Sequence, residues 1–232
     1  MRGDSLSKIN YKILNKTTNF TLLKIKYEMN NSSGLAITMG NTLRRIMLNN
    51  VMGTAVTSLT VNTPVSTALF SGNFKEDLFE IIANIKDLSL RSNKINNSIA
   101  YLNVQGPAVI TASDLMLPEG LTVINPHHYL FTIMKDVSIN LEFQIEQGFG
   151  YKLYNENFEA LSIKDNKFLI DANFTPVKKV NYKVILEDSE VNPGTLVETL
   201  FLEIWTNGSI SPLRAFFEAC KTTSLIFSTF LF

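Results

Sequence analysis

Cysteine, long apolar runs and excess charge are what this sequence lacks. Cys220 is the only cysteine among 232 residues, so the chain cannot form an internal disulfide. No uncharged stretch of about 20 apolar residues is present, and this argues against a membrane-spanning helix. No apolar segment follows Met1 either, which favours an unexported protein in a reducing compartment.

Net charge is also missing. Lysine plus arginine total 21, and aspartate plus glutamate total 21. A balanced chain has no sequence-wide positive field to hold a polyanionic backbone, so we do not expect it to bind DNA unaided.

Catalytic motifs are equally scarce. The sequence contains no GxSxG, no Walker loop and no paired-aspartate motif for magnesium. His127 and His128 are adjacent, which is not the i, i+4 spacing of helical metal ligands, and we predict a structural role for them. Cys220 lies on an apolar helical stripe, where a buried thiol is more common than a nucleophile. We therefore expect no catalytic residue, metal or cofactor in this chain, although an α+β hydrolase or transferase using either histidine stays an alternative.

What the sequence does contain is organised around residues 34–50, GLAITMGNTLRRIMLNN. Met39, Leu43, Ile46 and Met47 recur at steps of three and four, which predicts one amphipathic helix with an apolar seam. Arg44 and Arg45 are neighbours about 100° apart, so at least one guanidinium must look outward along the flank of the seam. The helix thus combines an apolar seam with a cationic edge.

The rest of the chain is mostly strand. Alternating patterns predict strands over 9–14, 20–28, 55–61, 88–91, 99–104, 122–124, 129–133, 137–147, 168–174, 179–186 and 199–206. Helical spacing predicts a second helix over 74–87, and Ser211-Pro212 marks the start of a third. This third helix carries an apolar stripe that includes Phe216, Phe217 and Cys220. Residues 225–232, LIFSTFLF, are apolar and are expected to pack against the body or a second copy.

Six blocks of the sequence resemble the alpha subunit of bacterial and plastid RNA polymerase, in the same order and at similar spacing, over roughly residues 8–220. They are GLAITMGNTLRRIMLNNVMGTAVTSL, FKEDLFEIIANIKDLSL, GPAVITASDLMLPEGLTVINP, GFGY, IDANFTPVKKVNYKV and LFLEIWTNGSISPLRAF. The resemblance implies an α+β fold: a discontinuous dimerisation domain of sheet plus two amphipathic helices, residues 1–50 and 169–232, interrupted by a sheet-rich insertion domain, residues 51–168. The DNA-binding C-terminal domain usual in the family is not expected here.

The same resemblance implies the function and partners. The chain would form a homodimer and act as the assembly platform for the two large catalytic subunits, beta and beta-prime, of a nucleotidyltransferase whose chemistry lies outside this chain. It would meet DNA only through the complex, and no membrane. The short length and abundant asparagine favour a plastid (chloroplast) over a bacterial cytoplasm. A homodimeric protein-binding scaffold unrelated to transcription is the other alternative.

Residue roles follow from the resemblance position by position. The dimer interface would comprise Met39, Leu43, Ile46, Met47, Phe216, Phe217 and Cys220. Contacts with the second-largest subunit would come from Arg44, Arg45, Leu48 and Glu80. Lys86, Ile170 and Val177 would face the largest subunit.

Overall fold

The computed structural model describes residues 8–28, 34–62, 72–93, 97–153, 166–188 and 196–230. The chain folds as two compact units, which we describe separately. The first is Met1–Val51 with Pro176–Phe232, and the second is Met52–Thr175. The predicted return to the first domain at residue 169 therefore differs from the structure, because residues 169–175 belong to the second unit. There Leu169 pairs with Ser58 of a neighbouring strand.

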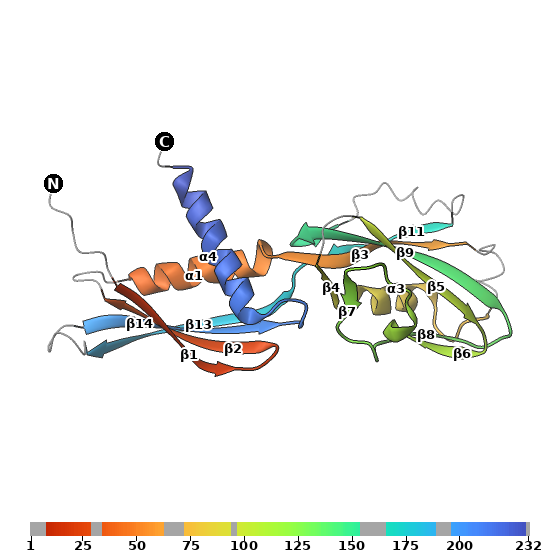
Figure 1. Cartoon of the computed structure of the whole chain (residues 1–232), viewed down its shortest axis with the longest axis horizontal. Coiled ribbons are helices and arrows are strands. Elements are labelled where there is room, and N and C mark those ends of the chain that lie inside the picture. The colour runs from red at the N-terminus through yellow and green to blue at the C-terminus, as the bar shows by residue number, and fades with distance from the viewer. Residues whose placement is uncertain are drawn as a thin grey trace. The chain divides into compact units, whose positions relative to one another are not determined.

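The first unit is one antiparallel sheet with two helices (Figure 1). Its strands lie in the order β1-β2-β14-β13. The elements are β1 (Lys8–Lys16), β2 (Phe20–Glu28), α1 (Leu35–Asn49), β13 (Val177–Asp188), β14 (Leu196–Thr206) and α4 (Pro212–Ser228).

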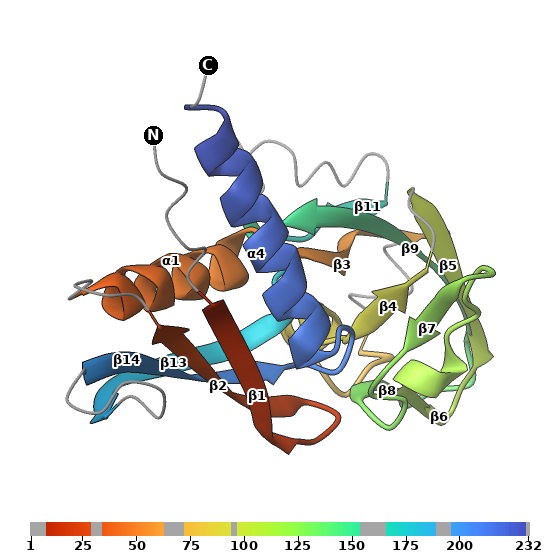
Figure 2. The same ribbon diagram turned by 60° about the vertical axis from the view of Figure 1, so that its left-hand side comes forward.

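The core of the first unit lies between this sheet and the two helices, which cover the same face of the sheet (Figure 2). Alternation along β14 explains the arrangement, since Leu200, Leu202 and Ile204 are fully buried and their neighbours in sequence face the other way. Ala36 and Leu43 of α1 and Ala215 and Ala219 of α4 pack into the same cluster.

The second unit is rich in sheet, as predicted. Its main sheet has the order β11-β3-β9-β5, and three two-stranded sheets pair β10 with β12, β4 with β7 and β6 with β8. The elements are β3 (Met52–Val61), α3 (Leu78–Lys86), β4 (Leu90–Ser92), β5 (Ser98–Gln105), β6 (Ala108–Thr111), η1 (Ala112–Asp114), β7 (Leu121–Val123), β8 (Tyr129–Ile133), β9 (Ser138–Phe149), β10 (Tyr151–Lys152), β11 (Lys167–Leu169) and β12 (Ala172–Asn173).

The structure confirms the α+β class, and it corrects several local predictions. Helix α3 starts at Leu78 and not at residue 74, because Asp77 and Glu80 form a reciprocal capping box and Phe74 bridges to Ile133 of β8. The single strand predicted over 168–174 is two short strands, β11 and β12. Within the part of the chain that is described, no helix is long and apolar enough to cross a membrane.

Candidate functional site: helices α1 and α4

Helix α1 carries the predicted cationic edge. Arg44 and Arg45 are both exposed, while Leu43 and Met47 on either side of them are almost fully buried against the sheet. Leu48, one turn beyond Arg44, is half-buried. Two guanidiniums therefore stand on a helix whose opposite side is fixed, and guanidiniums in this setting can form paired hydrogen bonds with carboxylates of a partner.

The first turn of α1 is held by a distant residue, Glu198 of β14. Its carboxylate accepts hydrogen bonds from the backbone amides of Gly34 and Ala36, the latter at 2.8 Å. Gly34 occupies the N-cap with φ of 94°, a left-handed conformation, and makes no side-chain cap itself. The amides at a helix start otherwise lack partners, so Glu198 satisfies them and places a negative charge at the positive end of the helix.

The middle of α1 lies very close to the sheet at Gly40. A Cβ atom at this position would lie 2.8 Å from Cδ2 of Tyr182 and 3.0 Å from Cδ1 of Leu200. Only a residue without a side chain fits at this approach. Glu198 and Gly40 together fix both the start and the middle of the helix that carries Arg44 and Arg45.

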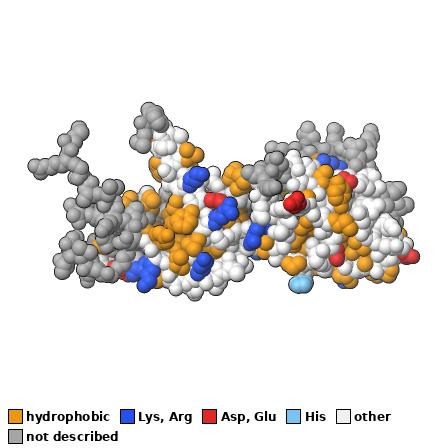
Figure 3. Space-filling model, in the orientation of Figure 1, with side chains coloured by type: hydrophobic (Ala, Val, Ile, Leu, Met, Phe, Trp, Pro, Cys, Tyr) orange, Lys and Arg blue, Asp and Glu red, His pale blue; other side chains and the backbone are white. Residues whose placement is uncertain are grey.

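Helix α4 begins with the predicted cap: Ser211 Oγ accepts from the amide of Arg214, and Pro212 occupies the first turn. The buried residues of the helix are Pro212, Ala215, Phe216, Ala219 and Thr223. Beyond Thr223 the side chains of the helix are mostly exposed, and large apolar residues are prominent among them: Leu225 (66% exposed), Ile226 and Phe227. Phe230 (77% exposed) follows just after the helix ends. Figure 3 shows hydrophobic side chains on this face of the molecule, with basic side chains among them.

The predicted dimer residues divide into two groups. Leu43, Ile46, Met47 and Phe216 belong to the core of the single chain, with Met39 and Cys220 half-buried at its edge. Their periodicity is therefore explained by packing on the chain's own sheet, and their part in a contact between copies stays a prediction. Phe217 is half exposed, with its ring edge against that of Tyr11 at 6.2 Å between centroids, so it stays available for a partner.

The predicted contacts for large subunits divide similarly. Ile170 and Val177 are 3% and 2% exposed, so their side chains offer a partner almost no surface in this conformation, and their contact with the largest subunit stays a prediction. Glu80 is exposed but also serves the capping box of α3. Lys86 Nζ lies 3.1 Å from Asp171 Oδ2, in a pair that is about one third exposed.

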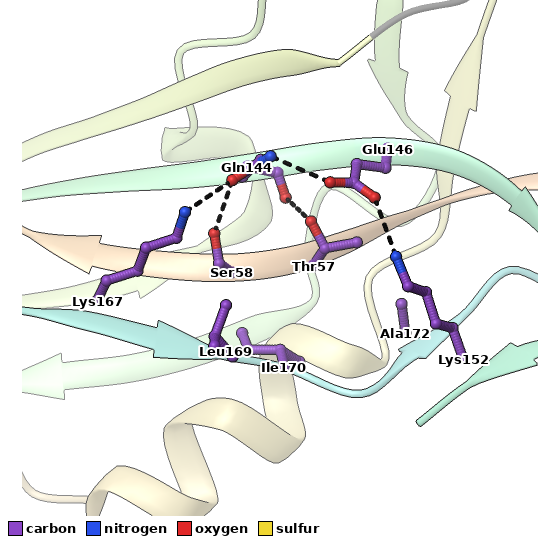
Figure 4. Close-up of a pocket in the computed structure, with 9 residues that line it drawn as sticks. All are labelled: Thr57, Ser58, Gln144, Glu146, Lys152, Lys167, Leu169, Ile170 and Ala172. Atoms are coloured by element: carbon purple, nitrogen blue, oxygen red, sulfur yellow. Dashed lines mark hydrogen bonds and ion pairs between the residues drawn. The ribbon is translucent and has the colours of Figure 1, made fainter. Parts of the chain in front are cut away.

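A cavity of about 220 Å³ opens in the second unit beside β3, β9 and β11 (Figure 4). Gln144 lies at its centre: its Oε1 accepts from Lys167 Nζ and Ser58 Oγ, each at 3.1 Å. Gln144 Nε2 in turn donates to Glu146, which faces Lys152 Nζ at 3.8 Å. Leu169, Ile170 and Ala172 line the apolar side. Ser58 donates to an amide and not to a base, so the cavity offers no activated nucleophile.

Neither His127 nor His128 lines this cavity. His127 is exposed, and Nε2 of His128 lies 2.8 Å from the carbonyl oxygen of Asn84. Burial raises the pKa of the Cys220 thiol, which makes it a poorer nucleophile. Across the described ranges, no group of three His, Cys, Asp or Glu side chains could hold a metal ion.

Sequence reasoning missed Glu198, although a signal for it exists. Glu198 has the same parity as Leu200, Leu202 and Ile204 along β14, so the alternation places a carboxylate on the buried face. A charge on that face needs partners, and in the described part of the chain the backbone amides at the start of α1 supply them. The exposed apolar end of α4 was recognised as a run but not as part of a helix.

Comparison with known proteins gives concordant results. The family model described as RNA polymerase Rpb3/RpoA insert domain matches residues 71–175, which end where the second unit ends. A DNA-directed RNA polymerase subunit alpha of Thalassiosira pseudonana is 42% identical over 85% of this chain and 62% of its own length. Those of Gracilaria tenuistipitata var. liui and Gloeobacter violaceus are 38% and 41% identical over 84% and 81% of this chain, and 61% and 59% of their own lengths.

The chain thus spans about three fifths of the length of these curated relatives. Because these matches cover more than four fifths of this chain, they extend into both units. The chain is therefore similar to RNA polymerase alpha subunits over more than four fifths of its length, and its residues 71–175 match the insert domain of Rpb3/RpoA.

Proposed function

We propose that this chain is the alpha subunit of a DNA-dependent RNA polymerase, which pairs with a second copy and presents α1 to the two large subunits. The nucleotidyl transfer is then a property of the complex, with no catalytic residue in this chain, and DNA is met only through the complex. The relatives come from algal plastids and cyanobacteria, so we propose a plastid location, with a bacterial cytoplasm as the alternative.

The proposed pairing of two copies rests on the exposed apolar side chains at the end of α4. Leu225, Ile226, Phe227 and Phe230 are 42% to 77% exposed, although burying one such side chain is worth about 1.5–3 kcal/mol. A two-fold contact would cover the same residues on both copies at once. In this arrangement Phe217 joins the contact, while Leu43, Met47 and Phe216 support it from within each protomer.

Dimerisation is tested by replacing Phe227 and Phe230 together with Asp. We expect the wild-type chain to elute as a dimer and the variant as a folded monomer, by size exclusion with light scattering and by circular dichroism. Replacement of the exposed Phe79 of α3 by Asp, in the other unit, is the matched control and should stay dimeric. A wild-type monomer at micromolar concentration would contradict the proposal.

Arg44 and Arg45 are the residues that we propose bind the second-largest subunit. Arg45→Ala should leave a folded dimer that fails to capture the second-largest subunit in a pull-down, since loss of an arginine anchor commonly costs about 2 kcal/mol or more. Arg91→Ala in β4 is a matched control that should capture normally. Arg44, Leu48 and Glu80 are proposed for the same partner, and Lys86 for the largest subunit. Equal capture by Arg45→Ala and wild type would refute the assignment.

Failure of any large polymerase subunit to co-purify with the tagged chain would instead favour a scaffold unrelated to transcription. The dimer test and the capture test are independent, because the two surfaces lie on different helices.

A further inference from the structure

The sheet of the first unit has a second face, opposite α1 and α4, which we call the outer face. Phe201, Glu203 and Trp205 of β14 point to it, in alternation with the buried Leu200, Leu202 and Ile204. These three outer side chains are half-buried although no helix covers them. The outer face thus carries aromatic side chains that the described part of the single chain leaves partly open.

Cross-strand register arranges this face in rows. One row joins Lys12, Lys24, Phe201 and Lys183 across all four strands. Lys24 Nζ lies 5.2 Å from the centroid of the Phe201 ring. The row is therefore an aromatic ring set among lysines.

A second row joins Phe20, Trp205 and Lys179. The two rings lie 4.8 Å apart between centroids, and Lys179 Nζ lies 4.9 Å from the centroid of Trp205. A second aromatic ring of β14 therefore lies under an ammonium group, and this one comes from β13 instead of β2.

A groove of about 430 Å³ lies along the first row, and Phe201 and Lys183 of that row are in its lining. Leu22, Ile185 and Phe201 supply its apolar lining, and Asn181, Lys183 and Glu203 its polar lining. A volume of this size accepts a large apolar side chain, and an apolar floor with a few polar groups at the rim is typical of a binding groove.

The charge of the outer face is positive. Among its described side chains are four lysines, Lys12, Lys24, Lys179 and Lys183, and two glutamates, Glu187 and Glu203. Glu187 is held by Lys24 Nζ at 2.8 Å and by the Thr199 hydroxyl at 3.1 Å, and Glu203 accepts from Asn181 at 3.4 Å. Lys179 and Lys183 make no ion pair with another described residue. Lys183 lines the groove, and Lys179 lies over Trp205 in the second row.

We propose that the outer face binds an acidic segment of a partner protein, which places one large apolar side chain in the groove and carboxylates against Lys183 and Lys179. Charge complementarity selects the acidic partner. The aromatic rings select protein over single-stranded nucleic acid, because their faces already lie against lysines or against each other and are not free for bases to stack. The inference goes beyond the proposed function, which uses only the helical face.

A photoreactive benzoylphenylalanine at position 185 tests the proposal in cells that make the complete protein. We expect a covalent adduct with another protein, which mass spectrometry maps to a segment with more Asp and Glu than Lys and Arg. Charge reversal of both lysines (Lys179→Glu with Lys183→Glu) should lower the adduct yield by about threefold or more. Lys75→Glu, an exposed lysine of the second unit, is the matched control and should leave the yield unchanged. Circular dichroism on each variant checks that the sheet is intact.

An adduct with nucleic acid, with a second copy of this chain or with a neutral or basic segment would overturn the proposal, and so would no adduct or a yield unaffected by charge reversal. The same probe at position 217 reports separately on the helical face, where the proposed function predicts an adduct with a second copy. Failure at 217 bears on the dimer, and failure at 185 bears on the outer face.

Discussion

Helices α1 and α4 pack on the same face of one sheet, but they differ in how much of their apolar surface the sheet buries. Helix α1 is fixed at its start by Glu198, in its middle by the close approach of Gly40 to Tyr182, and along its length by five buried residues. The second half of α4 instead exposes Leu225, Ile226 and Phe227 to solvent. A single protomer therefore buries the apolar side of α1 by itself. The apolar side chains in the second half of α4 need a partner to bury them.

This difference also separates two roles that one amphipathic pattern can serve. The apolar stripe of α1 holds the helix in place, so that its opposite side can present Arg44 and Arg45 in a constant position. The apolar stripe of α4 packs into the core as far as Thr223. Beyond Thr223 the stripe continues, but no core of the described chain covers it. The predictions below test this contrast, in order of decreasing expected effect.

The largest effect should come from the buried stripe of α1. Leu43 is 2% exposed, and Leu43→Ala should lower the free energy of unfolding by about 2–5 kcal/mol through lost burial and the cavity left behind. Phe227→Ala on α4 should change it by less than about 0.5 kcal/mol in the monomer, because the ring is already exposed. Urea unfolding at high dilution, followed by the fluorescence of Trp205, measures both. Similar losses in the two variants would abolish the contrast.

Removal of the cap should have the next largest effect. Glu198→Ala leaves the amides of Gly34 and Ala36 without their acceptor, and hydrogen bonds to charged groups are worth about 1.5–3 kcal/mol. The matched control is Glu203→Ala, five residues along the same strand on the outer face, which should cost less than about 0.5 kcal/mol. Thermal unfolding compares the two, and hydrogen exchange should locate the loss in the first turn of α1. Protection unchanged in that turn would show that Glu198 does not hold it.

Close packing at Gly40 should have a smaller net effect. Gly40→Ala gains helix propensity, about 0.5–1 kcal/mol, and loses about 1–3 kcal/mol from the clash with Tyr182 and Leu200. We expect a net destabilisation of about 1–2 kcal/mol, estimated from the same two contributions. In a Tyr182→Leu background the ring is gone, so the same substitution should be close to neutral or stabilising. A double-mutant cycle by urea unfolding measures the coupling, and additive effects would contradict the packing argument.

Much of this organisation was predictable from the sequence. Apolar spacing located α1 to within a residue at each end, and strand alternation found β2 and β8 at their observed bounds. The family resemblance supplied the α+β class. The two-residue strand β10 has too few side chains to show a period, so the sequence predicts no strand there. For the same reason the sequence does not separate β12 from β11.

The candidate site was less predictable, for a physical reason. Periodicity reports that a side chain is buried, but not whether its own chain or a partner buries it. Leu43, Met47 and Phe216 follow the same stripes as Phe217, and only the tertiary structure separates the three core residues from the exposed ring. Glu198 lies 164 residues from Gly34, so no local pattern connects the carboxylate to the helix start that it caps.

The smallest effect concerns Cys220, which lies on α4 where the buried half gives way to the exposed half. Burial raises the pKa of its thiol, so less thiolate is present near pH 8 than for an ordinary cysteine, and alkylation by iodoacetamide should be a few times slower than in the urea-unfolded chain. A cysteine placed at exposed Ile226 in a Cys220→Ser background should react at the ordinary rate in the dilute monomer and slow down as concentration rises. If the rate at position 226 stays constant with concentration while the chain dimerises, the exposed end of α4 is not the surface that a second copy covers.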